Sequence, residues 1–270
     1  MIAKRTKKST KQKTLKKLIS FYILQIFFLQ TNSQVNSDGS QVIIIELDSN
    51  IQQELDKFTN RKLIAFEKIS IGNFKGAIED LSYIILNFKK DKDYINDIYY
   101  NLGRVYFNNG DIDSAINYFR LSLFYTQKTK KFFFNETYLE LSKAFQTKNK
   151  LDSSIKYSSI YIKEEVDSSI GYWNRAYYYV LKKDFVKAEN DYKVSLLKSK
   201  KYHNQYTSAI YYDLLELYTY QNNQEKVLDI LKNIDNEVRN FICKNSTQLN
   251  LKYKEYYPKI CSLIETNTCK

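Results

Sequence analysis

One pattern recurs five times along the chain and constrains its fold more than any other feature. In each copy, two key positions lie 12 residues apart, and most of them hold small residues. The pairs are Ala65 and Ala77, Gly103 and Ala115, Ser142 and Ser154, Ala176 and Ala188, and Leu215 and Val227. Two antiparallel helices approach closely where both present small side chains, so the pattern predicts five helical hairpins. The last pair is larger, which fits a terminal hairpin with looser packing.

Polar, turn-forming segments fall between the two key positions of every copy. They begin at Gly72, Gly110, Lys150, Lys183 and Gln221, where the two helices of each hairpin have to be joined. Elsewhere the 270 residues contain little that breaks a helix, with only 6 glycines and 1 proline in total. This scarcity disfavours sandwiches, barrels and turn-dense α/β folds, and it favours long helices.

The second copy carries the most complete motif. It reads Tyr99-x-x-Leu102-Gly103-x-x-Tyr106, then Asn109-Gly110-Asp111, then Ala115-x-x-x-Phe119. This motif resembles the tetratricopeptide repeat, with Tyr99 standing where that family usually has tryptophan. The resemblance covers roughly residues 58–241 and implies an all-α fold. We therefore expect a right-handed α-solenoid of about five helical hairpins with a C-terminal capping helix.

Successive copies are separated by 38, 39, 34 and 39 residues, whereas the unit of the tetratricopeptide family is 34. Three junctions therefore carry four or five extra residues, about one helical turn. We expect longer second helices or longer loops at these junctions. The proline that the family usually has near the repeat end is absent, since the only proline is Pro258.

The expected organisation divides the chain into four parts. They are an N-terminal secretory signal peptide (1–33), a linker and leading helix (34–57), the repeats (58–91, 96–129, 135–168, 169–202 and 208–241) and a C-terminal capping segment (242–270).

The signal peptide is predicted from a basic segment followed by an apolar one. Residues 1–33 carry eight lysines and arginines and no acid, and an apolar stretch of 12 residues runs from Leu18 to Leu29. That stretch is too short to span a bilayer, and small residues follow it, so we expect cleavage after Ser33. The alternatives are an uncleaved interfacial anchor or a buried helix. Cleavage would leave an exported chain, periplasmic, cell-envelope-bound or secreted, with no stable membrane span.

Much of the formal charge of +12 lies in the same N-terminal segment. The rest of the chain is close to balanced, which is ordinary for a soluble surface and does not predict a nucleic-acid partner. Its single histidine, His203, and its scattered acidic residues do not assemble a catalytic or metal-binding pattern. We expect no enzymatic activity, no cofactor and no metal.

The resemblance implies that the first helices of the hairpins line a concave face that holds a protein or peptide partner. The candidate residues on this face are Tyr100, Arg104, Phe107, Asn108, Lys143, Trp173, Tyr177, Tyr212 and Glu216, with Lys62, Phe66, Leu139, Gln146 and Tyr220 at further equivalent positions. Exposed tryptophan, tyrosine and arginine dominate binding energy in interfaces, so Arg104, Trp173 and Tyr177 are expected to contribute most. The alternative is that several of these aromatic residues pack between repeats.

These features predict a non-catalytic scaffold or adaptor that binds a protein partner. Two other functions remain open. The first is a cell-envelope carbohydrate-binding module that uses exposed aromatic rings, and the second is a sensory component of a signalling system.

Three cysteines gather near the C-terminus, at Cys243, Cys261 and Cys269. An exported chain could oxidise one pair of them, which leaves the third thiol free. The sequence does not decide between one disulfide and three free thiols.

Overall fold

The structure is a computed structural model, and it describes residues 34–35, 41–42, 49–88, 92–129, 135–202, 205–253 and 258–269. The predicted signal peptide and His203 lie outside these residues. Two compact units make up the chain, unit 1 (Met1–Phe134) and unit 2 (Asn135–Lys270). The described part is helical apart from two short antiparallel strands in unit 1, β1 (Gln34–Val35) and β2 (Gln41–Val42).

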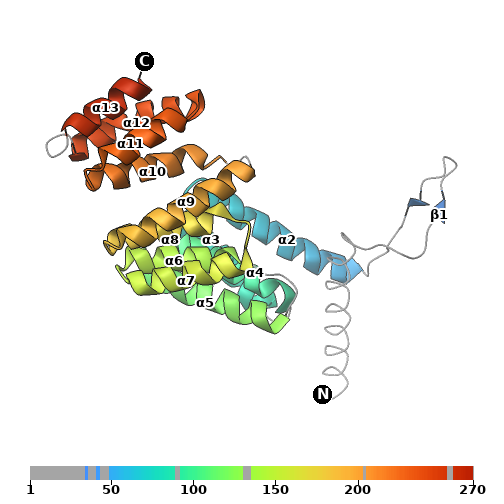
Figure 1. Ribbon diagram of the computed structural model, residues 1–270. Helices are drawn as coiled ribbons and strands as arrows, with labels where there is room; N and C mark the ends of the chain where they lie inside the picture. The colour runs from blue at the N-terminus through green and yellow to red at the C-terminus, as the bar shows by residue number, and fades with distance from the viewer. Residues whose placement is uncertain are drawn as a thin grey trace, which may run out of the picture. The chain divides into compact units, whose positions relative to one another are not determined.

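The described part of unit 1 contains four helices that form two hairpins. They are α2 (Ser49–Ser70), α3 (Phe74–Phe88), α4 (Lys92–Asn108) and α5 (Ile112–Thr129). Helix α3 packs between its partner α2 and the following α4, so the two hairpins stack through neighbouring helices (Figure 1). The core between them includes Leu81, Ile84 and Leu102, all fully buried.

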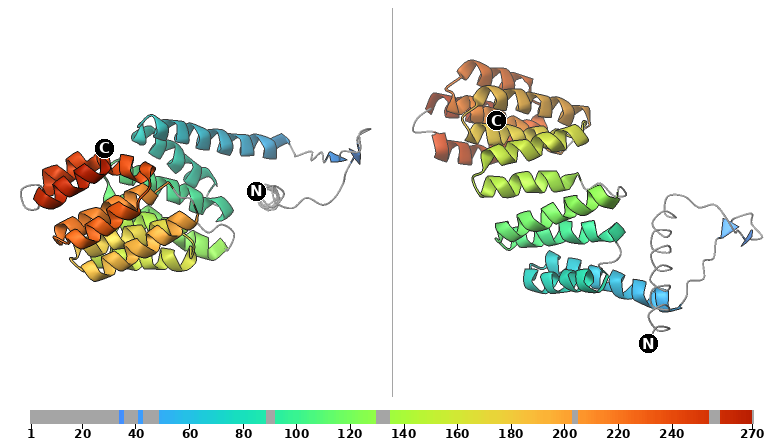
Figure 2. Two further views of the ribbon diagram at one scale, coloured as in Figure 1. Left: turned by 45° about the horizontal axis from the view of Figure 1, so that its top comes forward. Right: turned by 90° about the horizontal axis from the view of Figure 1, so that it is seen from below.

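Eight helices make up the part of unit 2 that the structure describes. They are α6 (Glu136–Thr147), α7 (Leu151–Glu164), α8 (Ser169–Leu181), α9 (Phe185–Lys201), α10 (Thr207–Tyr220), α11 (Gln224–Asn233), α12 (Asn236–Tyr253) and α13 (Pro258–Thr268). Neighbouring helices run side by side in alternating directions within the unit (Figure 2). The all-α fold of helical hairpins expected from the sequence is confirmed.

The C-terminal segment differs from the single capping helix that the sequence predicted, because it forms two helices. Helix α12 packs against α10, and α13 packs against both α11 and α12, as a sixth hairpin would. Pro258 is the first residue of α13. A proline lacks the backbone N–H that the first turn of a helix leaves unused, so it begins a helix readily and cannot continue the preceding one.

All ten key positions of the repeated pattern are buried, as the hairpin interpretation requires. The closest approach is at Gly103 in α4. A Cβ added there would lie 2.5 Å from the Phe119 ring on α5, nearer than side chains pack. The small residues therefore allow the paired helices to touch, and the 12-residue spacing follows from the geometry of the hairpin.

The five turns between paired helices share one backbone feature. One residue in each adopts a left-handed conformation, at Gly72 (φ 75°), Gly110 (84°), Asn149 (54°), Lys183 (61°) and Asn222 (54°). These residues recur at the spacing of the sequence repeat. Asparagine tolerates this conformation better than most residues, whereas lysine has no such advantage.

The extra residues at the repeat junctions lengthen helices. The spacing between copies predicted longer second helices or longer loops at these junctions. Helices α5 and α9, with 18 and 17 residues, exceed the 14 residues of α7, which precedes the shortest junction. At the first junction the added length lies mainly in a first helix, because α4 has 17 residues and α8 has 13.

Replacing Lys183 by glycine is expected to raise the free energy of unfolding by about 0.5 to 1 kcal/mol, because glycine adopts a positive φ without steric cost. Urea denaturation followed by circular dichroism measures the change. The matched control is Lys150→Gly in an equivalent turn, where φ is −94°. Glycine at position 150 only adds conformational freedom to the unfolded chain, so this variant should lower the free energy of unfolding. Destabilisation by both variants would contradict the prediction.

Candidate partner-binding face

The predicted face residues fall in both units. Helix α4 of unit 1 carries Tyr100, Arg104, Phe107 and Asn108, of which Arg104 and Asn108 are exposed. The Arg104 guanidinium lies 5.9 Å from the centre of the Tyr100 ring. The centre of the Tyr100 ring also lies 6.1 Å from the centre of the buried Phe119 ring, so Tyr100 contributes to packing as well as to the surface.

Two of the further equivalent positions have partners or are buried. Lys62 on α2 forms an ion pair with Asp97 on α4, and its ammonium lies 5.5 Å from the centre of the Phe66 ring. Leu139 on α6 is only 5% exposed and belongs to the core, so it does not line a surface. Leu139 was assigned to the face because it has the same register as the face residues of the other copies. As an apolar residue it is buried at this position instead.

In unit 2 the predicted residues Trp173 and Tyr177 on α8 and Tyr212 and Glu216 on α10 come from neighbouring first helices of the hairpins. Lys143 lies on α6 and is paired with Glu140 at 3.1 Å. Tyr177 is 44% exposed, whereas Trp173 and Tyr212 are partly buried against the core. The face is therefore aromatic, and its most accessible predicted rings are those of Tyr177 and of Tyr220 on α10, which is 45% exposed.

Trp173 makes the most specific contact of these residues. Its indole Nε1–H donates a hydrogen bond to Oδ2 of Asp213 on α10, with a donor–acceptor distance of 2.6 Å. The indole ring also lies 5.4 Å from the Tyr206 ring. Trp173 is held in place from both sides, and it joins α8 to α10.

Asp213 has an unusual environment for a carboxylate. Burial raises its pKa to about 6, the hydrogen bond from Trp173 opposes that rise, and the nearby charge of Glu216 adds to it. Lys252 on α12 lowers the pKa, because its positive charge favours the ionised carboxylate. A largely buried carboxylate with a raised pKa is a candidate functional group.

Tyr192 on α9 reaches the same place from the core. Its side chain is 2% exposed, and burial raises the pKa of its hydroxyl, with further contributions from the charges of Asp213 and Glu216. The tyrosine therefore adds a buried hydroxyl to the surroundings of the Asp213 carboxylate.

Glu216 and Lys252 form an ion pair between α10 and α12 beside Asp213. We refer to Trp173, Tyr177, Tyr192, Asp213 and Glu216, together with Lys252, as the Asp213 cluster. It combines two carboxylates, one ammonium and three aromatic rings contributed by four helices. This arrangement suits recognition of a charged group.

Reasoning from the sequence identified three members of this cluster and missed Asp213, Tyr192 and Lys252. A signal for Asp213 was present. It lies two residues before the key position Leu215, and polar residues occupy the same register in other copies, at Asn101 and Asn174. Tyr192 and Lys252 carry no comparable signal, because one is on a second helix and the other is outside the repeats.

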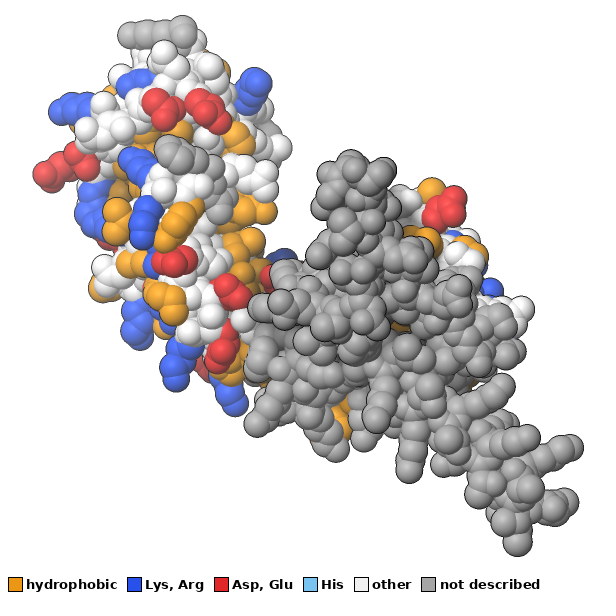
Figure 3. Space-filling model, turned by 90° about the vertical axis from the view of Figure 1, so that its right-hand side faces the viewer, with side chains coloured by type: hydrophobic (Ala, Val, Ile, Leu, Met, Phe, Trp, Pro, Cys, Tyr) orange, Lys and Arg blue, Asp and Glu red, His pale blue; other side chains and the backbone are white. Residues whose placement is uncertain are grey.

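Charged side chains of both signs are interspersed with apolar ones on the described surface (Figure 3). No described helix is long and apolar enough to cross a membrane. Among the described residues, no group of three or more histidines, cysteines or acidic residues is placed to hold a metal ion.

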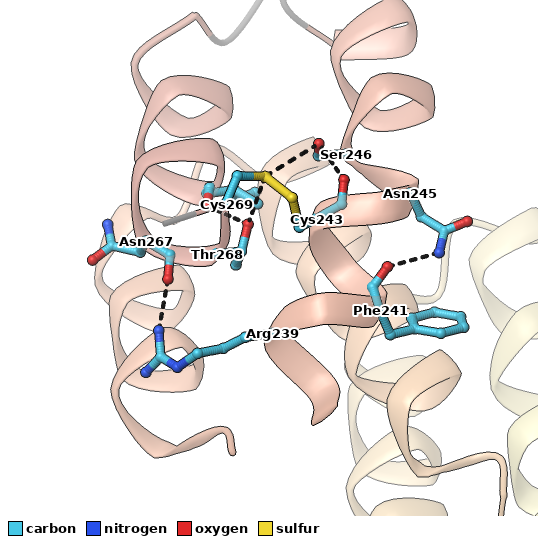
Figure 4. The surroundings of a disulfide bond; sticks show 9 residues. Arg239, Phe241, Cys243, Asn245, Ser246, Asn267, Thr268 and Cys269 are labelled. Carbon is cyan, nitrogen blue, oxygen red and sulfur yellow. Dashed lines mark hydrogen bonds between the residues drawn. A yellow bond between two sulfur atoms is a disulfide. The ribbon is translucent and has the colours of Figure 1, made fainter. Parts of the chain in front are cut away.

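A disulfide joins Cys243 on α12 to Cys269, which directly follows α13 (Figure 4). Cys261 is buried and is not part of the disulfide. The sequence did not decide between one disulfide and three free thiols, and the structure contains one disulfide. Arg239 supports the same junction, because its guanidinium donates to the Asn267 carbonyl at 2.6 Å. The sixth hairpin is therefore covalently closed at one end.

Comparison with known proteins agrees with the motif. Residues 97–123, in the second hairpin, match the family model of the tetratricopeptide repeat. The resemblance to the tetratricopeptide repeat is thereby confirmed for the second hairpin. The match covers α4 from its second turn and most of α5, including the key pair Gly103 and Ala115. No curated protein matches the sequence.

Solved tetratricopeptide structures share the fold at low sequence identity. MamA residues 41 to the end from Desulfovibrio magneticus RS-1 superposes with a TM-score of 0.55 at 11% identity, covering 66% of this chain and 92% of that one. Nearly identical tetratricopeptide-like repeats assigned to a kinesin light chain of Podosopora anserina give 0.55 at 14%, covering 70% and 97%. Another MamA structure gives 0.53 at 16%, covering 74% and 96%. These likenesses establish the α-solenoid fold of stacked helical hairpins.

Proposed function

We propose that the protein is an exported, non-catalytic scaffold that binds a protein partner through the first-helix face of unit 2. The tetratricopeptide fold supports a role in protein–protein interaction, and stacked helices present a rigid surface that needs little reordering on binding. The observation that carries the proposal is the Asp213 cluster. It places the exposed ring of Tyr177 and the partly buried ring of Trp173 beside a largely buried carboxylate.

A protein partner fits this cluster better than a carbohydrate does. Sugar binding by aromatic stacking needs a flat ring that is open to solvent, whereas the Trp173 ring lies 5.4 Å from Tyr206 and its Nε1–H is engaged by Asp213. Partly buried aromatic residues at the centre of a polar surface are typical of interface hot spots.

Export is supported by the disulfide, since such bonds persist in oxidising compartments and are rare in the cytosol. We expect protein purified from its cell of origin, denatured without reductant, to accept one alkyl group, at Cys261. Reduction should expose Cys243 and Cys269 and raise the number to three. Intact-mass spectrometry gives both counts. Three modified cysteines before reduction would contradict an oxidised, exported chain.

The scaffold role is tested by removing exposed aromatic rings from the proposed face. The variant carries Tyr177→Ala and Tyr220→Ala, two residues that are 44% and 45% exposed. We expect at least about tenfold less partner to be retained in affinity capture, because interface aromatic residues each contribute 2 kcal/mol or more at hot spots.

The matched control changes two exposed apolar residues on a second helix, Val186→Ala and Leu197→Ala on α9, which are 73% and 71% exposed. This control should retain the partner at the wild-type level, and circular dichroism should show both variants folded. Equal retention by the tyrosine variant and the control would contradict the proposed face.

A further inference from the structure

One register of the first helices changes its chemistry along the chain. The last residue of each first helix follows the first key position by five residues, and it is exposed in all five copies. In α2, α4 and α6 it is polar, as Ser70, Asn108 and Thr147, whereas in α8 and α10 it is Leu181 and Tyr220. The hairpin does not require an apolar residue at this position, because three copies form it with a polar one. The fold alone therefore does not explain Leu181 and Tyr220.

Leu181 and Tyr220 belong to one group of apolar side chains in unit 2. Tyr177 lies one helical turn before Leu181 on the same side of α8, and these two residues are 44% and 40% exposed. Tyr220 is 45% exposed, and the centre of its ring lies 5.3 Å from that of Phe185, the first residue of α9. We refer to Tyr177, Leu181, Phe185 and Tyr220 as the Leu181 patch. Single exposed apolar residues are common on proteins, whereas groups of them typically mark interaction sites.

Lysines dominate the two turns that border this patch. The α6–α7 and α8–α9 turns, with the helix starts that follow them, carry five lysines and two aspartates, a net charge of +3: Lys148, Lys150, Lys182, Lys183 and Lys187, with Asp152 and Asp184. We refer to these five lysines as the lysine edge. An ion pair between Lys182 and Asp152 brings the two turns together. The α10–α11 turn beyond Tyr220 adds one charge of each sign, on Glu225 and Lys226.

Both aspartates of these turns already have a cation. Asp152 pairs with Lys182, and a carboxylate oxygen of Asp184 lies 2.7 Å from the ammonium of Lys187. The remaining lysines therefore leave an excess of positive charge directly beside the Leu181 patch.

The acidic residues of the first-helix face do not cancel this charge. Glu140 and Glu216 are each paired with a lysine, and Asp213 is largely buried. Glu136 begins α6, so it lies at the opposite end of that helix from the turn. A partner that lies on the patch therefore meets mainly the field of the lysine edge, which attracts negative charge.

We propose that the Leu181 patch and the lysine edge together bind a segment of the partner that carries a bulky apolar side chain next to acidic residues. The apolar side chain packs on Leu181 and on the rings of Tyr177 and Tyr220, which removes apolar surface from water. The acidic residues pair with exposed lysines such as Lys150 and Lys183. The inference rests on the proposed function, because it specifies which part of the first-helix face is used and which partner chemistry it accepts.

Two other occupants fit this surface less well. A symmetric contact between two copies of the chain through the Leu181 patch would bring two lysine edges together, and like charges oppose it. The same repulsion disfavours a basic segment of a partner.

The test requires no knowledge of the partner. A library of short random peptides, displayed as fusions to their own mRNA, is selected on the immobilised protein, and the enriched sequences are read out. We expect them to combine a large aliphatic or aromatic residue with two or more acidic residues close to it. The most enriched peptide is then synthesised with a fluorescent label, and fluorescence anisotropy gives its dissociation constant. Binding should weaken severalfold between low and high salt, because salt screens exposed charges.

The apolar contact is tested by Leu181→Thr combined with Tyr220→Thr. This variant gives α8 and α10 the ending that α6 already has in Thr147, so circular dichroism should show it folded. The labelled peptide should bind it about tenfold or more weakly, because the apolar side chain loses its contacts. The matched control is Val166→Thr with Leu197→Thr, two residues that are 64% and 71% exposed and lie outside the patch. This control should bind the peptide like wild type.

The charge preference is tested by Lys150→Glu combined with Lys183→Glu. Both lysines are exposed, and glutamate at position 183 meets the same left-handed backbone as lysine. This variant should bind the labelled peptide about tenfold or more weakly, because two attractive charges become repulsive. The matched control, Lys163→Glu with Lys232→Glu in the last turns of α7 and α11, changes the net charge equally. It should weaken binding by less than about twofold.

The proposal is overturned if no peptide is enriched, if the enriched peptides are neutral or basic, or if either the threonine or the glutamate variant binds the labelled peptide like wild type. Such a result would leave the scaffold role standing, provided that partner capture still depends on Tyr177 and Tyr220. If capture is independent of these two residues as well, the first-helix face itself is the wrong surface, so the two failures are distinguishable.

Discussion

Replacing Gly103 by valine is expected to lower the free energy of unfolding of unit 1 by about 3 kcal/mol. A Cβ at this position would lie 2.5 Å from Cδ1 and Cε1 of Phe119, and Phe119 is fully buried. Its ring has no room to retreat, so α4 and α5 have to separate. Urea denaturation followed by circular dichroism measures the loss.

The matched control is Arg104→Val, one residue further along the same helix. Arg104 is exposed, so this variant reports the lower helix propensity of valine, which costs less than about 1 kcal/mol. A large difference between the two variants shows that close helix contact causes the effect. Equal losses would contradict the close approach that defines the hairpin.

Replacing Asp213 by asparagine is expected to stabilise unit 2 by about 2 kcal/mol at pH 7. The wild-type carboxyl has its pKa raised from 3.8 to about 6, chiefly because burial disfavours the charged form. Ionising it in the folded state therefore costs free energy that an amide does not. The amide oxygen can still accept the hydrogen bond from Trp173 Nε1–H.

The pH dependence of this difference follows from the direction of the shift. Below about pH 4 the carboxyl is protonated in both the folded and the unfolded chain, and the advantage of the variant disappears. Wild type then loses stability relative to the variant as the pH rises from about 4 to 6, and the difference is constant above that range.

Urea denaturation at pH 4, 5, 6 and 7, followed by Trp173 emission, measures this curve. Glu225→Gln on α11 is the control for removing an exposed carboxylate and should change stability by less than about 0.5 kcal/mol. A destabilised Asp213→Asn variant at pH 7 would show that the charge supports the fold. The expected gain in stability is typical of a residue that the fold tolerates at a cost.

The hairpins could be predicted from the sequence because their determinants are local and repeat. Small residues at pairs such as Ala176 and Ala188 are required wherever two helices touch, and a turn must lie between them. The same reasoning located the turns, including the one at Lys183, whose side chain gives no hint that its backbone is left-handed.

The Asp213 cluster could be predicted only in part, because it depends on contacts between distant segments. The Trp173–Asp213 hydrogen bond links residues 40 positions apart, and the Glu216–Lys252 pair links residues 36 positions apart. Equivalence between copies identified the surface positions of α8 and α10. It could not identify Tyr192, which reaches the cluster through the core, or Lys252, which lies beyond the repeats.

The C-terminal hairpin illustrates the same limit. Three cysteines allow three pairings, and only the packing of α13 beside α12 brings Cys269 to Cys243. That Pro258 begins a helix, α13, is likewise seen only in the structure.

Site-specific photo-cross-linking in the cell of origin tests the central claim most directly, namely that the first-helix face of unit 2 holds a protein partner. A photoreactive amino acid replaces Tyr177 on α8 in one protein and Leu197 on α9 in another, both exposed positions. The account predicts a discrete cross-linked protein from position 177, reduced by Asp213→Asn, and none from position 197. Cross-links from position 197 alone, or the same adducts from both positions, would contradict it.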